Sequence, residues 1–186
     1  YASEAILTTD LVKKEIADEI GYRPLIIAPA THDTASAVLA VPDNGKNSLY
    51  LSSGTWSIMG VPVEDAITKP SLSGKRYSNE GGINYTFRFQ TNIMGMWIFQ
   101  NVKKELGDDS FAHLTEIAGK SDYKEIFDVN DNRFFAPKSM IAEITSYFEE
   151  KNIAPPKTPA DICYCIFNSL AECYKNTIKE ISEITG

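Results

Sequence analysis

The predicted fold is decided by one stretch, Leu25-Ile26-Ile27-Ala28-Pro29-Ala30-Thr31-His32-Asp33-Thr34-Ala35-Ser36-Ala37-Val38-Leu39-Ala40. An apolar run ends at Pro29, polar side chains follow, and small apolar residues then continue to position 40. This order predicts a buried strand, a loop and a short helix over residues 33–41. Ligands bind at such junctions in α/β folds, because rigid elements hold the backbone while side chains leave the core. Asp33, with His32 and Thr34 beside it, is therefore the first candidate site residue.

The composition is that of an ordinary globular protein and excludes several classes of function. Of 186 residues, 43% are apolar and 23% are charged, and the net charge is −7. No apolar run reaches the ~18 residues of a membrane span, and no basic stripe interrupts the acidic average. We therefore expect neither a membrane nor a nucleic acid as a partner. The 3 cysteines all fall in one predicted helix without metal-ligand spacing, which predicts reduced thiols and a cytoplasmic location.

The chain before this stretch has the pattern of a helix. Thr8-Thr9-Asp10 offers side chains that could cap it, and Val12, Ile16 and Ile20 follow at a spacing of four. Gly21 stands where a C-terminal glycine belongs. After the stretch, Pro42-Asp43-Asn44-Gly45 is a strong turn signal. We expect a domain boundary there, which divides the chain into residues 1–42 and residues 43–186.

The second part begins with strand patterns. Residues 48–51 and 56–63 flank the turn Ser52-Ser53-Gly54-Thr55, which predicts a β-hairpin. Residues 83–89 alternate well enough for a third strand. A helix is then expected from Asn92 to Leu106, closed by Gly107. That helix would place Asn92 and Gln100 on one face, eight residues apart.

Further helices are expected toward the end of the chain. The predicted ranges are 110–118, 139–151 and 160–184. Thr158 is expected to cap the last of these helices, and Pro159 to occupy its first turn. Trp56, Trp97, Phe87 and Phe89 are expected in the core.

Asp33 is the candidate catalytic group. A carboxylate at a strand-to-helix junction can accept the proton of a substrate hydroxyl as its oxygen attacks phosphorus. His32 and Thr34 could bond neighbouring hydroxyls. Taken alone, however, an Asp at this position more often caps the helix that follows.

Two further groups could contact a ligand. The turn with Ser53, Gly54 and Thr55 offers backbone N–H groups and hydroxyls that can hold phosphates without a formal charge. Its simpler interpretation is an ordinary Ser/Gly turn, and no Walker-type phosphate loop occurs in the chain. The amides of Asn92 and Gln100 could bond a sugar and a nucleotide, although taken alone they are more often part of a solvated helix face.

Together these segments resemble the FGGY family of carbohydrate kinases over residues 5–185. Five blocks carry the resemblance, in register: Thr31-His32-Asp33-Thr34-Ala35-Ser36-Ala37-Val38, Leu51-Ser52-Ser53-Gly54-Thr55-Trp56-Ser57-Ile58-Met59-Gly60, Asn79-Glu80-Gly81-Gly82, Arg88-Phe89 and Asn92-Ile93-Met94-Gly95-Met96-Trp97. The resemblance implies an α/β fold with two ribonuclease-H-like domains of the actin/hexokinase type. Residues 1–42 would end the sugar-binding domain, and residues 43–186 would begin the ATP-binding domain with a β-hairpin, a third strand and several helices.

The resemblance also implies an activity, in which ATP with Mg²⁺ phosphorylates the 1-hydroxyl of L-rhamnulose. Asp33 matches the general base. The matched sugar-binding residues are His32, Asp33, Thr34 and Asn92. The residues expected to bind nucleotide are Ser53, Gly54, Thr55 and Gln100.

The chain departs from the family pattern in what it lacks. The N-terminal phosphate motif Asp-x-Gly-Thr and the Gly-Gly-Gly turn that holds adenosine are absent from the sequence. Pro29 also stands near a position where related sugar kinases often carry glycine. We therefore expect an internal fragment that is inactive alone, with its Mg²⁺ ligands elsewhere and with apolar surface that favours self-association.

Two alternatives remain open on the sequence. The first is another kinase of the same family, acting on fuculose, xylulose or glycerol. The second is a non-catalytic sugar- or nucleotide-binding module of actin-like fold.

Overall fold

The structure, a computed structural model, divides into two compact units, Tyr1–Ser48 and Leu49–Gly186. The residues that it describes are 6–29, 33–42, 48–82, 85–108 and 110–186. Among these residues, no helix combines the length and the apolar character needed to cross a bilayer.

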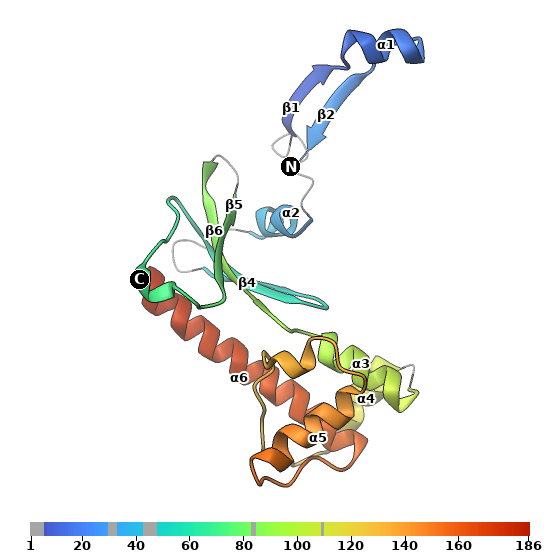
Figure 1. The fold of residues 1–186 in the computed structure, drawn as a ribbon, viewed down its shortest axis with the longest axis vertical. Coiled ribbons are helices and arrows are strands. Elements are labelled where there is room, and N and C mark those ends of the chain that lie inside the picture. Colours follow the sequence, from blue (N-terminus) through green and yellow to red (C-terminus); the bar gives the residue numbers. More distant parts are fainter. Residues whose placement is uncertain (1–5, 30–32, 43–47, 83–84, 109) are drawn as a thin grey trace. The chain divides into compact units, whose positions relative to one another are not determined.

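The first unit contains an antiparallel pair of strands, β1 (Ile6–Leu11) and β2 (Leu25–Pro29). Helix α1 (Lys14–Ile20) connects them at one end of the ladder (Figure 1). The helix ends at Gly21, whose φ of 83° is left-handed and whose N–H bonds the carbonyl of Ala17 at 2.9 Å. This confirms the predicted C-terminal glycine, because such a φ favours a residue without a Cβ.

Two predictions in this unit are wrong. Thr8-Thr9-Asp10 does not cap a helix but lies in β1, opposite Ala28, Ile27 and Ile26. The paired strand satisfies the backbone of this segment, so the helix starts only at Lys14. Residues 25–28 do form the predicted strand, but Leu25, Ile26 and Ile27 are about half exposed. Among the described residues of this unit, no further layer packs on the two-stranded sheet and covers these side chains.

After β2, the predicted short helix is confirmed as α2 (Asp33–Ala40). Most of the predicted turn at Pro42–Gly45 lies outside the described residues.

The second unit is built on a four-stranded antiparallel sheet in the order β3-β4-β6-β5. The strands are β3 (Tyr50–Ser53), β4 (Ser57–Val63), β5 (Tyr77–Gly81) and β6 (Phe87–Ile93). A 3₁₀ turn, η1 (Pro70–Leu72), lies in the connection from β4 to β5. The predicted β3–β4 hairpin is confirmed, with Ser53 opposite Ser57.

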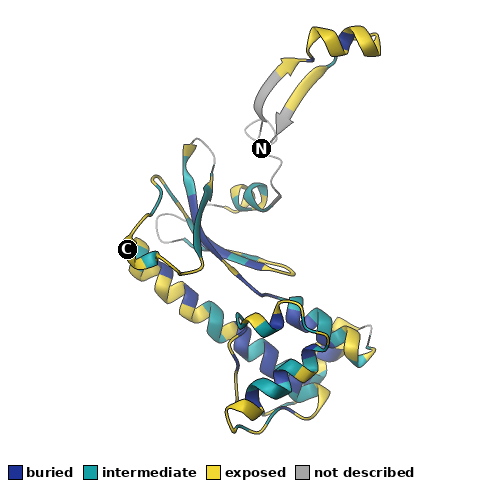
Figure 2. Ribbon diagram, in the orientation of Figure 1, coloured by how far each residue is buried: buried dark blue, intermediate teal, exposed yellow. Residues whose placement is uncertain are grey.

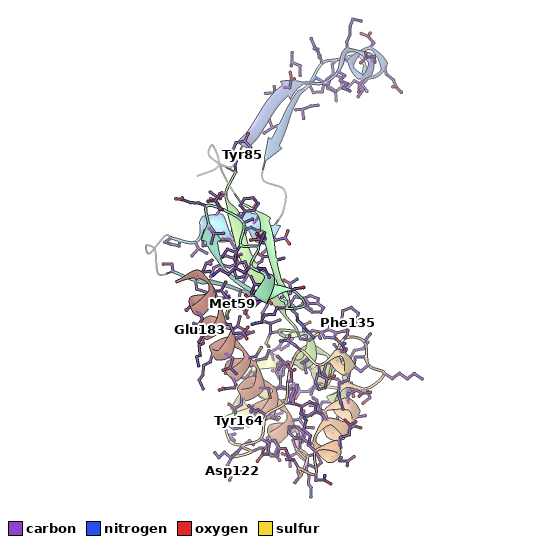
Figure 3. The ribbon with its side chains drawn as sticks, turned by 60° about the vertical axis from the view of Figure 1, so that its left-hand side comes forward. Met59, Tyr85, Asp122, Phe135, Tyr164 and Glu183 are labelled. Atoms are coloured by element: carbon purple, nitrogen blue, oxygen red, sulfur yellow. The ribbon has the colours of Figure 1, made fainter. Side chains whose placement is uncertain are left out.

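The predicted third strand is displaced in the structure. It was expected over residues 83–89, whereas β6 runs from Phe87 to Ile93 and pairs with both β4 and β5. Tyr85 has a φ of 63° and is 99% exposed, and it lies in the connection between β5 and β6 (Figure 3). Pairing with β4 holds β6 extended through Asn92 to Ile93, so the helix that was predicted from Asn92 begins later.

Four helices follow the sheet: α3 (Trp97–Leu106), α4 (Phe111–Ala118), α5 (Met140–Glu150) and α6 (Pro159–Thr185). The last three begin close to their predicted positions, where Ser110, Ser139 and Thr158 accept backbone N–H bonds as N-caps. Gly107 ends α3 with a φ of 66°, as predicted. A 3₁₀ turn, η3 (Asn132–Phe134), precedes α5.

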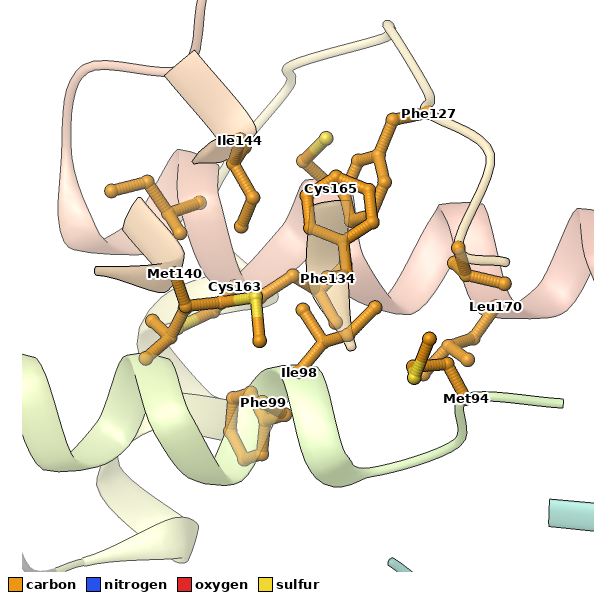
Figure 4. Close-up of a cluster of buried hydrophobic side chains, with 14 of the residues drawn as sticks. Met94, Ile98, Phe99, Phe127, Phe134, Met140, Ile144, Cys163, Cys165 and Leu170 are labelled. Carbon is orange, nitrogen blue, oxygen red and sulfur yellow. The ribbon is translucent and has the colours of Figure 1, made fainter. Parts of the chain in front are cut away.

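The core of the second unit joins one face of the sheet to the helices. Met59 and Ile93 from the sheet belong to the same buried cluster as the side chains of the four helices. Figure 4 shows Ile98 and Phe99 of α3 close to Phe134, Met140 and the α6 side chains. The buried positions concentrate where the helices meet and along the middle of the sheet (Figure 2). The three cysteines form no disulfide in the structure, and Cys163 and Cys165 are buried, while the reduced state of the thiols stays a prediction.

Candidate functional site at the β3–β4 turn

The turn between β3 and β4 presents its side chains to solvent. Ser53, Gly54, Thr55 and Trp56 are all exposed, whereas Ser57 at the start of β4 is buried. The Gly54 N–H bonds the carbonyl of Trp56 at 3.1 Å, which tightens the turn. The hydroxyls of Ser53 and Thr55 are thus accessible to a ligand.

The start of α3 holds this turn in place. The Met96 N–H donates to the Gly54 carbonyl at 3.1 Å, and the Trp97 N–H donates to the Thr55 carbonyl at 2.9 Å. The first N–H groups of a helix have no partner within the helix. The turn carbonyls supply two of those partners, so the turn and α3 are held together through their backbones.

Gly95 makes this close approach possible. Its φ is 59°, and a methyl group there would lie 2.6 Å from the backbone nitrogen of Ser57 and 2.8 Å from the Thr55 carbonyl oxygen. Only glycine fits both the left-handed backbone and the short distance. Gly95 lies two residues after the end of β6 and lets the chain approach the β3–β4 turn closely.

Two of the residues that were predicted to bind nucleotide come together. Thr55 Oγ1 donates to Gln100 Oε1 at 3.3 Å, although the residues are 45 positions apart. Thr55 is exposed and Gln100 is partly exposed, so a hydroxyl and an amide lie side by side at the surface. Such a pair can bond a polar ligand that approaches the turn.

Asn92 does not share a helix face with Gln100, which corrects the prediction. It lies in β6 opposite Ile58 of β4, and its side chain is exposed. Asn92 is in a strand and Gln100 is in a helix, so the helical repeat that would place them on one face does not apply.

The remaining predicted site residues lie in the first unit. His32 is outside the described residues, and the backbone of Asp33 begins α2 while its side chain is not described. Thr34 is partly buried in the first turn of α2. The roles given to these three residues stay predictions.

Some residues near the turn were not predicted as parts of the site. The hydroxyls of Ser57 and Tyr174 lie 2.7 Å apart across 117 positions of sequence, a separation that no local pattern could reveal. Trp56 was expected in the core, but it is 42% exposed and packs against Phe135, with 6.0 Å between ring centroids. Figure 3 shows Phe135 where the helical cluster approaches the sheet.

No metal-binding residue was predicted in this chain from its sequence. No group of three or more His, Cys, Asp or Glu side chains there could hold an ion. The expectation that Mg²⁺ ligands lie elsewhere in a longer protein stays a prediction.

Comparison with known proteins decides the family. The model of the C-terminal domain of the FGGY family of carbohydrate kinases matches residues 49–186. The chain belongs to this family. The FGGY domain thus coincides with the second compact unit, and it contains the β3–β4 turn, Gln100 and Asn92.

Several FGGY relatives match nearly the whole chain. A rhamnulokinase of Oceanobacillus iheyensis is 44% identical over 174 residues, which are 93% of this chain and 37% of that protein. A rhamnulokinase of Halalkalibacterium halodurans is 43% identical over the same shares of each chain. One from Bacillus subtilis is 41% identical over 86% of this chain and 33% of its own length. The chain therefore spans about a third of the length of these relatives.

Proposed function

We propose that this chain is part of a longer ATP-dependent sugar kinase that phosphorylates the 1-hydroxyl of L-rhamnulose. The observation that carries the proposal is the match of 93% of the chain, at 44% identity, to a protein named rhamnulokinase. The contact between Thr55 and Gln100 also supports it, because two residues to which the family resemblance assigns the nucleotide lie together at one surface.

The β3–β4 turn is the proposed nucleotide side of the site. The backbone and hydroxyls of Ser53, Gly54 and Thr55 would hold the terminal phosphates, and Gln100 would contact the nucleotide beside them. The exposure of the turn and its attachment to α3 support this role. A turn that is fixed before the ligand arrives loses little entropy on binding.

The sugar side is assigned to residues 32–34 and Asn92. Asp33 would take the proton of the 1-hydroxyl while that oxygen forms its bond to the terminal phosphorus and the phosphorus–oxygen bond to ADP breaks. His32, Thr34 and Asn92 would bond other sugar hydroxyls. ATP supplies the phosphoryl group, and Mg²⁺ would be held by residues of the longer protein outside this chain.

We propose that the fold is of the ribonuclease-H-like, actin/hexokinase type. Residues 1–42 would end the sugar-binding domain, and residues 43–186 would begin the ATP-binding domain. The start of the FGGY match at residue 49 and the division into two units support this arrangement. We further propose a cytoplasmic location, and self-association of the isolated chain through the half-exposed apolar side chains of β2.

A substrate panel tests the function. The full-length protein that contains this chain is assayed for ADP formation with L-rhamnulose, L-fuculose, D-xylulose and glycerol. We expect the highest kcat/KM with L-rhamnulose. A higher value with another substrate would overturn the substrate assignment. Absence of turnover with all four, in a protein that binds ATP, would favour the non-catalytic module instead.

A further inference from the structure

Two adjacent residues of α6, Cys173 and Tyr174, are linked to the two chain segments that form the candidate nucleotide site, Tyr174 directly and Cys173 through Asn130. The Tyr174 hydroxyl lies 2.7 Å from the hydroxyl of Ser57, the first residue of β4. Ser57 has no exposed surface, so this bond is shielded from solvent on the Ser57 side. It fixes the end of the turn that includes Thr55.

Cys173 acts on the other segment through Asn130. Asn130 Nδ2 donates to Cys173 Sγ at 3.4 Å, and Asn130 Oδ1 accepts the N–H of Met94 at 3.2 Å. The Asn130 side chain therefore ties α6 to the junction between β6 and α3. The backbone carbonyl of Asn130 also accepts a bond from Arg76 Nη2 at 2.6 Å. Burial raises the pKa of the Cys173 thiol, which keeps it neutral as a partner of the Asn130 amide.

The segment from Met94 to Trp97 and the β3–β4 turn are closely packed against each other. Gly95 follows Met94 directly, and a methyl group at Gly95 would overlap Ser57 and the Thr55 carbonyl. Met96 and Trp97 then donate to the turn carbonyls. A shift of the Met94 segment must therefore move the turn, and so must a shift of Ser57.

Helix α6 is held in place by its packing in the hydrophobic core, so it can act as a fixed support for the turn. Its earlier part contributes Ile162, Cys163, Cys165, Ile166 and Leu170 to the buried cluster between the helices. Interiors this closely packed deform little. A bond from α6 to the turn thus holds the turn against the core of the whole unit.

We propose that Tyr174 and Asn130 are positioning residues for nucleotide binding, and that they hold the Thr55 turn in register with Gln100. The inference rests on the proposed nucleotide role of that turn. Neither side chain needs to touch the ligand. Their effect follows because small displacements of a binding group cost much of its contribution.

The test uses the full-length protein and separates positioning from general stability. Tyr174→Phe removes only the hydroxyl, and Asn130→Ala removes both side-chain bonds, whereas Asn130→Asp keeps an acceptor for Met94. Tyr77→Phe is the matched control, because the Tyr77 hydroxyl also bonds α6, at Glu180 and 2.6 Å, but does not contact the turn. The measurements are the Kd for ADP by calorimetry, the KM for ATP and for the ketose, and the melting temperature.

We expect Tyr174→Phe and Asn130→Ala to raise the Kd for ADP and the KM for ATP ~3- to 10-fold, as for loss of one hydrogen bond. The KM for the ketose should not change. Asn130→Asp keeps the acceptor for Met94 but loses the donor to Cys173, so it should recover only part of the affinity lost in Asn130→Ala. Tyr77→Phe should lower the melting temperature without changing either nucleotide constant.

Equal nucleotide constants in Tyr174→Phe, Asn130→Ala and Tyr77→Phe would overturn the inference. Thr55→Val distinguishes failure of the positioning role from failure of the proposed nucleotide site. If Thr55→Val weakens ADP binding while the two α6-linked variants do not, only the positioning role fails. If Thr55→Val also leaves ADP binding unchanged, the proposed nucleotide site itself is wrong.

Discussion

Thr55 in the β3–β4 turn donates a hydrogen bond to Gln100 in α3, with 3.3 Å between Oγ1 and Oε1. The two side chains meet because the carbonyls of Gly54 and Thr55 accept the N–H groups that begin α3. The contact is thus a consequence of backbone geometry, and a ligand that approaches the turn meets both groups together.

This contact predicts coupled effects on nucleotide binding. Thr55→Val and Gln100→Ala should each raise the KM for ATP, by ~3- to 10-fold if each removes one hydrogen bond. The double variant should show less than the product of the two effects, because contacting residues are not independent. Steady-state kinetics on the full-length protein measures this. Thr145→Val is the control, since the Thr145 hydroxyl donates within its own helix, to the Ile141 carbonyl; an equal effect there would count against the turn.

Asp33→Asn tests the proposed general base. The amide cannot take a proton, so kcat should fall by ~10²–10⁴-fold in the full-length kinase. Circular dichroism and melting temperature should match the wild type, because Asn has nearly the same size and shape as Asp. Near-normal turnover would remove Asp33 from the proposed role of general base.

Gly95→Ala tests the close approach of β6 to the turn. Gly74 is the matched control, because its φ of 77° is also left-handed but a methyl group there would meet nothing within 4 Å. We expect Gly74→Ala to cost ~1–2 kcal/mol for the backbone alone. Gly95→Ala should cost a further ~1–3 kcal/mol from overlap with Ser57 and Thr55. Urea unfolding midpoints compare the two, and equal costs would show that the turn can move aside.

We expect Asp161 to make the stability of the folded state depend on pH in the acidic range. A hydrogen bond from Ser121 at 2.6 Å, and then one from Thr158 at 2.7 Å, lower the pKa of Asp161 below its usual value. The folded state thus favours the carboxylate. The resulting stability is fully present above the unfolded pKa of about 4, and it is lost as the pH falls through the lower folded pKa.

Asp161→Asn should therefore be less stable than the wild type at pH 7, and the difference should shrink on acidification below about pH 4. Thermal melts between pH 7 and pH 3 measure both proteins under matched buffers. A difference that stays constant over this range would assign the effect of Asp161 to packing alone.

The sequence by itself determined the elements that depend on neighbouring residues. Ser110, Ser139, Thr158 and Pro159 mark helix starts that the structure has within one residue, and Gly107 marks a helix end. The β3–β4 hairpin follows from its turn residues in the same way. These features are local, because a cap or a tight turn is stabilised by residues within a few positions of it.

Tertiary structure decided what depends on distant partners. Thr8–Asp10 could cap a helix, but pairing with β2 makes them a strand. The helix predicted from Asn92 does not begin there, because pairing with β4 holds β6 extended to Ile93. The meeting of Thr55 with Gln100, and of Ser57 with Tyr174, likewise arises only after the sheet and helices pack. The physical reason is that strand pairing and core packing join segments across tens of residues, so their free energy appears in no local pattern.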